Sequence, residues 1–213
     1  MADQGGFNFR NLFSDRAPEA GTGRAVAKRG KYDFAVAYPD PASLPLDDLA
    51  EGLRQALHEE GRELAVYPHP EGYPPLREYV SEKLRRDRGI GVSPDDILLA
   101  DGSSQPLHML IDALVNPGDV VLTEDFVYSG TLGILRRFRA DIRGVATDGE
   151  GMLPDALESA IVAAKAEGMP VKMIYTIPTF QNPQGWTMSL ERRREMVRLA
   201  GKHAVPILED DCY

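Results

Sequence analysis

Short apolar segments alternate with amphipathic ones from about residue 96 onward, and this alternation limits the possible fold more than any other feature. The apolar runs predict strands at 97–100, 120–122, 142–146, 171–177 and 205–208. Apolar residues at helical spacing predict helices around 107–114, over 128–139, around 153–161 and over 189–203. Because strands and helices alternate, the fold class is α/β, with a mostly parallel sheet covered by helices.

The first 45 residues lack this pattern, and we predict that residues 1–45 form an arm and a loop. One domain is then predicted over 46–213, and it starts with two helices. Four leucines at helical spacing mark the first helix: Leu46, Leu49, Leu53 and Leu57. The second helix follows a Pro-rich loop over 67–75 and ends near Gly89. No covering helix follows the last strand, so we expect the sequence to be interrupted within this domain.

Charge and cysteine content exclude several classes of protein. The formal net charge is -9, which argues against nucleic acid as a main partner because phosphate binding needs a basic face. Cys212 is the single cysteine, so no disulfide can form within the chain and a reducing compartment is indicated. No secretory signal and no membrane-length apolar run is present in the sequence. We therefore expect a cytoplasmic protein without membrane partners.

Ligands of open α/β sheets bind at the carboxyl ends of the strands. Four segments with polar or aromatic residues follow predicted strands, and they are 101–105, 125–128, 178–185 and 209–213. If the sheet is wound as predicted, the four segments converge.

The first two segments each allow two interpretations. Gly102, Ser103 and Ser104 join a strand to a helix, where hydroxyls and unpaired N–H groups suit a phosphate. The alternative is a plain helix cap made by one of the serines. Tyr128 opens the next helix, where its ring could lie against a flat ligand or could be an ordinary half-buried tyrosine.

The last two segments carry an amide and three carboxylates. Prolines and a glycine surround Asn182, whose amide could donate to a ligand or belong to a surface turn. Glu209, Asp210 and Asp211 follow a buried strand, where crowded carboxylates repel one another, so we expect one to have a cationic partner. The four histidines show no ligand spacing with these acids, and no metal site is predicted.

Taken together, the four segments resemble the fold-type-I pyridoxal-phosphate enzymes, specifically the class I/II aminotransferases. The similarity runs from about Phe34 to Tyr213. It implies an incomplete large domain of that fold with an N-terminal arm, and pyridoxal 5'-phosphate as the cofactor.

The resemblance also implies roles for individual residues. Gly102, Ser103 and Ser104 would form the phosphate cup, which Gln105 extends, and Tyr128 would stack on the pyridine ring. Asp210 would pair with the pyridine nitrogen. Asn182 and Tyr213 would donate to the cofactor's phenolic oxygen. Tyr67 would reach the phosphate of a neighbouring subunit, which implies a homodimer with shared sites.

Two departures from the family pattern stand out. The loop at 35–39 has no glycine before its proline, which puts substrate contacts there in doubt. The lysine that forms a Schiff base with the cofactor is expected roughly thirty residues beyond Asp210, past the last residue here. Lys165, Lys172 and Lys202 lack its serine-lysine context, and none replaces it. As written, the polypeptide is not expected to transaminate.

The resemblance implies a transaminase that moves an amino group between an L-amino acid and a 2-oxo acid. Its loops are closest to the branch that handles aminoadipate, aromatic or branched-chain substrates. Three alternatives stay open: another reaction on the same cofactor, such as β-elimination or a condensation; the sensor domain of a transcription regulator built on this fold; and a scaffold without cofactor. The residues present would bind the cofactor without selecting the reaction.

Overall fold

The structure is a computed structural model that describes residues 12–14, 17, 31 and 39–212. Contacts between residues divide the chain into two compact units, Met1–Pro94 and Asp95–Tyr213. The boundary predicted at residue 45 is a different division and stays a prediction. No helix in the described ranges is both long and apolar enough to cross a membrane.

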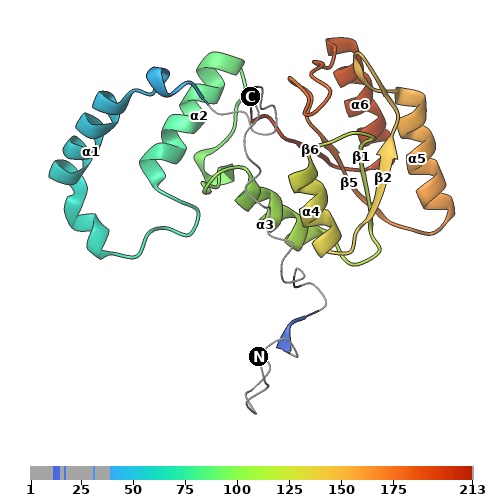
Figure 1. The fold of residues 1–213 in the computed structure, drawn as a ribbon, viewed down its shortest axis with the longest axis horizontal. Coiled ribbons are helices and arrows are strands. Elements are labelled where there is room, and N and C mark those ends of the chain that lie inside the picture. Colours follow the sequence, from blue (N-terminus) through green and yellow to red (C-terminus); the bar gives the residue numbers. More distant parts are fainter. Residues whose placement is uncertain (1–11, 15–16, 18–30, 32–38, 213) are drawn as a thin grey trace. The chain divides into compact units, whose positions relative to one another are not determined.

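The described part of the first unit is built on two helices, α1 and α2 (Figure 1). Helix α1 spans Leu46–Glu60 and α2 spans Pro74–Arg88, and short 3-10 turns occupy Pro41–Ser43 and Gly61–Ala65. Another 3-10 turn, Pro94–Asp96, lies where the two units meet in the sequence. Helix α2 ends at Gly89 in the left-handed conformation, with φ of 68°, as a C-terminal glycine often does. Both predicted helices are confirmed.

The apolar stripe of α1 stays exposed in the described structure. Leu49 and Leu53 are each 62% exposed. Helical periodicity therefore identified the helix correctly but did not identify a buried face. The segment after α2, in contrast, folds back along its helix, because Arg77 Nε donates to the Pro94 carbonyl at 2.9 Å and Ser81 Oγ donates to the Val92 carbonyl at 2.6 Å.

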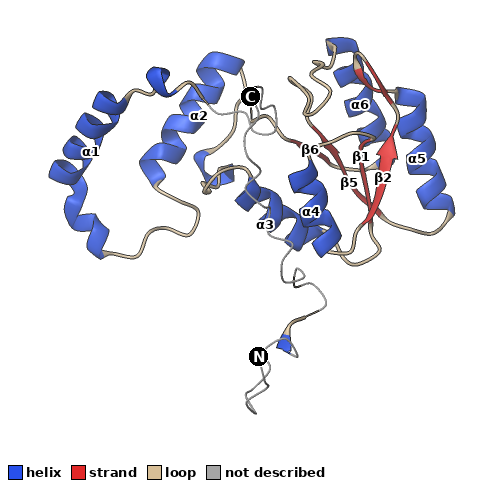
Figure 2. Cartoon of the chain, in the orientation of Figure 1, coloured by secondary structure: helices blue, strands red, loops and turns tan. Residues whose placement is uncertain are grey.

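The second unit contains a four-stranded parallel sheet in the order β2-β1-β5-β6 (Figure 2). Its strands are β1 (Val120–Glu124), β2 (Asp141–Val145), β5 (Val171–Thr176) and β6 (Ile207–Glu209). A small antiparallel hairpin, β3 (Thr147–Asp148) with β4 (Gly151–Met152), was not predicted. The α/β class and the parallel sheet are confirmed.

Four helices cover the sheet: α3 (Ser104–Leu114), α4 (Ser129–Arg137), α5 (Pro154–Ala166) and α6 (Leu190–His203). Alternate residues of β1 point to opposite faces. Val120 and Leu122 pack with residues of α5 and α6, such as Ile161, whereas Val121 packs with residues of α3 and α4, such as Leu135. The sheet is thus covered on both faces, which explains why its strands are continuous apolar runs.

The strand predicted at 97–100 is wrong. In the structure this segment follows the 3-10 turn Pro94–Asp96 as irregular chain and pairs with none of the four strands described. Leu98 is 46% exposed. An apolar run becomes a strand only where a neighbouring strand offers its N–H and C=O groups. The described chain places no strand beside residues 97–100.

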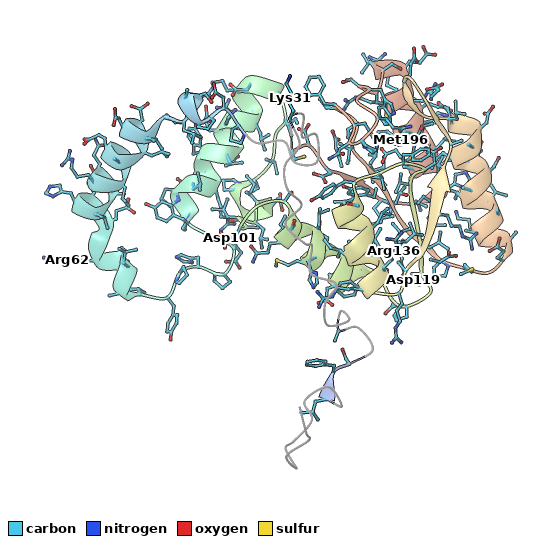
Figure 3. All side chains as sticks on the ribbon, in the orientation of Figure 1. Lys31, Arg62, Asp101, Asp119, Arg136 and Met196 are labelled. Atoms are coloured by element: carbon cyan, nitrogen blue, oxygen red, sulfur yellow. The ribbon has the colours of Figure 1, made fainter. Side chains whose placement is uncertain are left out.

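All four strands of the sheet run in one direction, so their carboxyl ends share one edge. The segments after β1, β5 and β6 leave the sheet at that edge. Asp119, labelled in Figure 3, directly precedes β1 and so lies at the opposite edge of the sheet, where the strands begin.

Candidate functional site

A pocket of about 260 Å³ joins the start of α3 to the segment after β6. Ser103, Pro106 and Leu107 line it from α3, and residues 208–212 line it from the other side. Ser103 and Asp210 therefore face the same pocket. A complete small-molecule site typically measures roughly 300–1,000 Å³, so this pocket could hold one part of a ligand.

The side chain of Ser103 makes no capping hydrogen bond at the start of α3, although Ser103 occupies the N-cap position. Gly102 before it has φ of 68°, a left-handed conformation that favours glycine. Asp101 (Figure 3) donates its N–H to Gln105 Oε1 at 2.6 Å, which closes the loop. Ser103 is therefore not a plain side-chain cap of α3, and a phosphate at this helix start stays a prediction.

Tyr128 lies at the N-cap of α4 and its side chain lies over Gly130. A Cβ atom built on Gly130 would lie only 2.4 Å from Cε1 and 2.9 Å from the hydroxyl oxygen of Tyr128. The ring therefore occupies space that exists because residue 130 has no side chain. Tyr128 is 41% exposed, and its stacking on a planar ligand stays a prediction.

The loop that carries Asn182 is tied to the segment that carries Tyr128. Gln181 is buried; its Nε2 donates to the Phe126 carbonyl at 2.7 Å, and its Oε1 accepts from the Gln184 N–H at 2.8 Å. Asn182 itself is partly buried. The segments after β1 and β5 are thus held side by side.

Arg193 on α6 holds the same loop at both ends. Its Nη2 donates to the Pro178 carbonyl and to Thr179 Oγ1, both at 2.9 Å, and its Nε donates to the Met188 carbonyl at 3.1 Å. Its Nη1 also lies 3.4 Å from a carboxylate oxygen of Glu209. The cation expected near the crowded carboxylates is therefore beside Glu209.

Asp210 has a hydroxyl rather than a cation as its protein partner. Its backbone N–H donates to the Thr176 carbonyl at 2.9 Å, and its Oδ2 accepts from the Tyr175 hydroxyl at 2.6 Å. Tyr175 in turn accepts from Thr131 Oγ1 at 3.0 Å. Asp210 is 9% exposed and opens to the pocket described above.

Glu124, the last residue of β1, is a further buried carboxyl near this edge. Its Oε1 accepts from Thr176 Oγ1 at 2.6 Å and from the Ile177 N–H at 3.0 Å, whereas its Oε2 has no hydrogen-bond partner among the described residues. Burial raises the pKa of Glu124 above its usual range, and the two hydrogen bonds only partly oppose that rise. Glu124 links the end of β1 to the start of the Asn182 loop.

The structure does not test the roles of several predicted site residues. Tyr67 lies in the first unit and is 99% exposed. Tyr213 and residues 35–38 lie outside the described residues. The roles of these residues stay predictions. Among the described residues, no group of three or more His, Cys, Asp or Glu side chains could hold a metal ion.

The sequence interpretation missed the residues that brace the site, chiefly Tyr175, Thr131, Glu124, Gln181 and Arg193. A signal existed for two of them. Tyr175 and Glu124 stand within buried strands, where a polar group must find a partner.

The family model described as "Aminotransferase class I and II" matches residues 35–213. The chain belongs to this family. An aromatic-amino-acid aminotransferase of Thermococcus litoralis is 33% identical over 180 residues, which are 84% of this chain and 43% of that protein. An uncharacterized HTH-type transcriptional regulator of Escherichia coli, YdcR, is 33% identical over 84% of this chain and 37% of its own.

Solved aminotransferases share the fold. The crystal structure of an archaeal alanine:glyoxylate aminotransferase matches with a TM-score of 0.75 and 41% identity, covering 81% of this chain and 42% of that one. An α-aminoadipate aminotransferase from Thermus thermophilus, complexed with N-(5'-phosphopyridoxyl)-L-leucine, matches with a TM-score of 0.74 and 31% identity, covering 84% and 43%. The chain thus spans less than half the length of these four proteins, and the fold is a partial fold-type-I aminotransferase fold.

Proposed function

We propose that the chain supplies part of the cofactor site of a pyridoxal-phosphate-dependent aminotransferase, which transfers an amino group from an L-amino acid to a 2-oxo acid. The observation that carries the proposal is the pocket shared by Ser103 and Asp210. One end offers an uncapped helix start, and the other offers a buried carboxylate. A phosphate and a protonated ring nitrogen need these two groups, respectively.

The donor set of the site fits pyridoxal phosphate. Gly102, Ser103 and Ser104 would hold the phosphate at the start of α3, and Tyr128 would lie against the pyridine ring. Asn182 would donate to the phenolic oxygen. The small volume of the pocket fits one part of such a molecule, so other residues must complete the site.

Asp210 would hold a proton on the pyridine nitrogen. When bound, pyridoxal phosphate supplies an electron sink that stabilises the carbanion left by removal of the substrate's α-proton. A carboxylate beside the ring nitrogen favours the protonated ring by a charge-assisted hydrogen bond. Because Asp210 is nearly buried, water would screen this bond little.

A regulatory role is the second candidate, because the Escherichia coli relative is named as a transcriptional regulator. The same cofactor site would serve either role. The names of the other relatives include aromatic amino acids, alanine and aminoadipate, and they do not select one substrate.

A cytoplasmic homodimer in which Tyr67 reaches the partner's phosphate remains part of the proposal. The near-complete exposure of Tyr67 leaves its ring available to a second subunit.

The experiment compares Asp210→Ala with Asp155→Ala in the protein expressed from its complete gene. Asp155 is an exposed carboxylate in the first turn of α5. Asp210→Ala should weaken pyridoxal phosphate binding and lower transamination by roughly ten- to a hundredfold, the usual cost of losing a hydrogen bond to a charged group. Asp155→Ala should change neither. Near-normal turnover in Asp210→Ala would refute the assigned role, and pyridoxal phosphate binding without turnover in the parent would favour the regulatory role.

A further inference from the structure

The carboxylate of Asp210 is the end of a hydrogen-bonded chain that begins on helix α4. Thr131 lies on α4, one turn after Tyr128, and Tyr175 lies on β5. Thr131 and Tyr175 are fully or almost fully buried, at 0% and 1% exposed. The two bonds, 3.0 Å from Thr131 to Tyr175 and 2.6 Å from Tyr175 to Asp210, connect α4, β5 and the segment after β6.

The direction of each bond follows from the donors that are present. A carboxylate only accepts, so the Tyr175 hydroxyl donates its single proton to Asp210 Oδ2. The Tyr175 oxygen is then left to accept, and Thr131 is its donor. Burial, followed by the bond to Asp210, raises the pKa of Tyr175 far above its usual range. The phenol therefore remains a donor at every pH at which the protein would be studied.

We infer that Tyr175, with Thr131 behind it, is the positioning residue that orients the Asp210 carboxylate toward the cofactor's ring nitrogen. The inference rests on the proposed function. With Oδ2 held by the Tyr175 hydroxyl, the carboxylate would offer its other oxygen to a protonated ring nitrogen and stabilise that proton by a charge-assisted hydrogen bond. The bond from Tyr175 fixes the carboxylate at Oδ2, and the bond from the Asp210 N–H to the Thr176 carbonyl fixes the main chain of the same residue.

The test uses pyridoxal phosphate labelled with ¹⁵N in the ring, bound to the protein expressed from its complete gene. The ¹⁵N resonance distinguishes a protonated from an unprotonated ring nitrogen. Tyr175→Phe should move the resonance toward the unprotonated position and weaken binding about tenfold or more. Thr176→Val is the matched control, because Thr176 is equally buried and donates at the same 2.6 Å, but to Glu124 rather than Asp210. It should leave the resonance in place.

A second pair of variants guards against misfolding of Tyr175→Phe. Thr131→Val removes the outer hydroxyl and keeps the shape of the side chain, and it should move the resonance in the same direction by a smaller amount. Thr131→Ser restores the hydroxyl and should restore the parent resonance. An unmoved resonance in folded Tyr175→Phe, or in Thr131→Val if the first variant does not fold, would overturn the inference while leaving the cofactor site intact. Failure of the parent to bind pyridoxal phosphate would instead overturn the proposed function and, with it, the inference.

Discussion

Replacing Glu124 by glutamine should make the protein progressively more stable than its parent as the pH rises. Glu124 is 1% exposed, its Oε2 has no hydrogen-bond partner in the part of the chain that the structure describes, and burial is the largest influence on its pKa. Ionising such a group in the folded state is costly, whereas the unfolded chain exposes it to water. The amide of glutamine keeps an oxygen for Thr176 and Ile177 and does not titrate.

The magnitude follows from proton linkage. The folded-state pKa of Glu124 lies above its ordinary value of 4.5, so between those two values the folded protein retains a proton that the unfolded chain has lost. The favourable contribution is complete below pH 4.5 and is lost as the pH rises through the folded-state pKa. Across that window the parent should lose about 1.4 kcal/mol of unfolding free energy per pH unit relative to the variant. The glutamine amide nitrogen near the Oε2 position changes the unfolding free energy of the variant by the same amount at every pH. The slope of the free-energy difference with pH therefore stays the same.

The assay is urea denaturation followed by circular dichroism from pH 4.5 to 9 in the parent and in Glu124→Gln. Glu195→Gln is the control: its carboxylate is on the same unit, and a hydrogen bond from Arg198 lowers the pKa of Glu195. Above about pH 6 that group is ionised in both states, because its unfolded-state pKa is 4.5 and its folded-state pKa is lower, so its variant should differ from the parent there by a constant amount. A constant difference for Glu124→Gln as well would refute the reasoning about its burial.

Two further predictions concern the helix starts at the site. Gly130→Ala should displace the Tyr128 ring, because the new Cβ would lie 2.4 Å from Cε1; a crystal structure of the variant with the ring unmoved would contradict this. Ser189→Ala should cost about 0.5–2 kcal/mol of unfolding free energy, because Ser189 Oγ accepts from the Arg192 N–H. Ser103→Ala should lower the unfolding free energy much less, because the Ser103 hydroxyl makes no capping bond. Urea denaturation of both variants measures the two losses. Equal losses would mean that Ser103 is an ordinary cap.

The fold of the second unit was largely predictable because its elements depend on local patterns. The runs around Val121 and Ile174 are apolar enough to be buried on both sides, and the helices between them carry clear apolar stripes. The run at 97–100 has the same composition but no strand beside it in the described chain. Pairing with a distant strand is a tertiary property, and composition alone does not report it.

The site was predictable as a set of loops but not as a network. The segment with Asp210 follows from the rule that ligands bind at the carboxyl edge of a parallel sheet. The segment with Ser103 was assigned to that edge by a predicted strand that the structure does not contain, yet Ser103 and Asp210 line one pocket. The bonds that brace them join residues far apart in the sequence. Tyr175 and Asp210 are separated by 35 positions, and Glu124 and Thr176 by 52. No local periodicity specifies such pairs, and only the winding of the sheet brings them together.

The measurement that tests the account most directly is a crystal structure of the protein, expressed from its complete gene, with pyridoxal phosphate bound. The account predicts the ring nitrogen about 2.7–3 Å from the Asp210 carboxylate and the phosphate against the Gly102–Ser104 turn. A cofactor bound with its phosphate away from the start of α3, or with its ring nitrogen out of reach of Asp210, would contradict it.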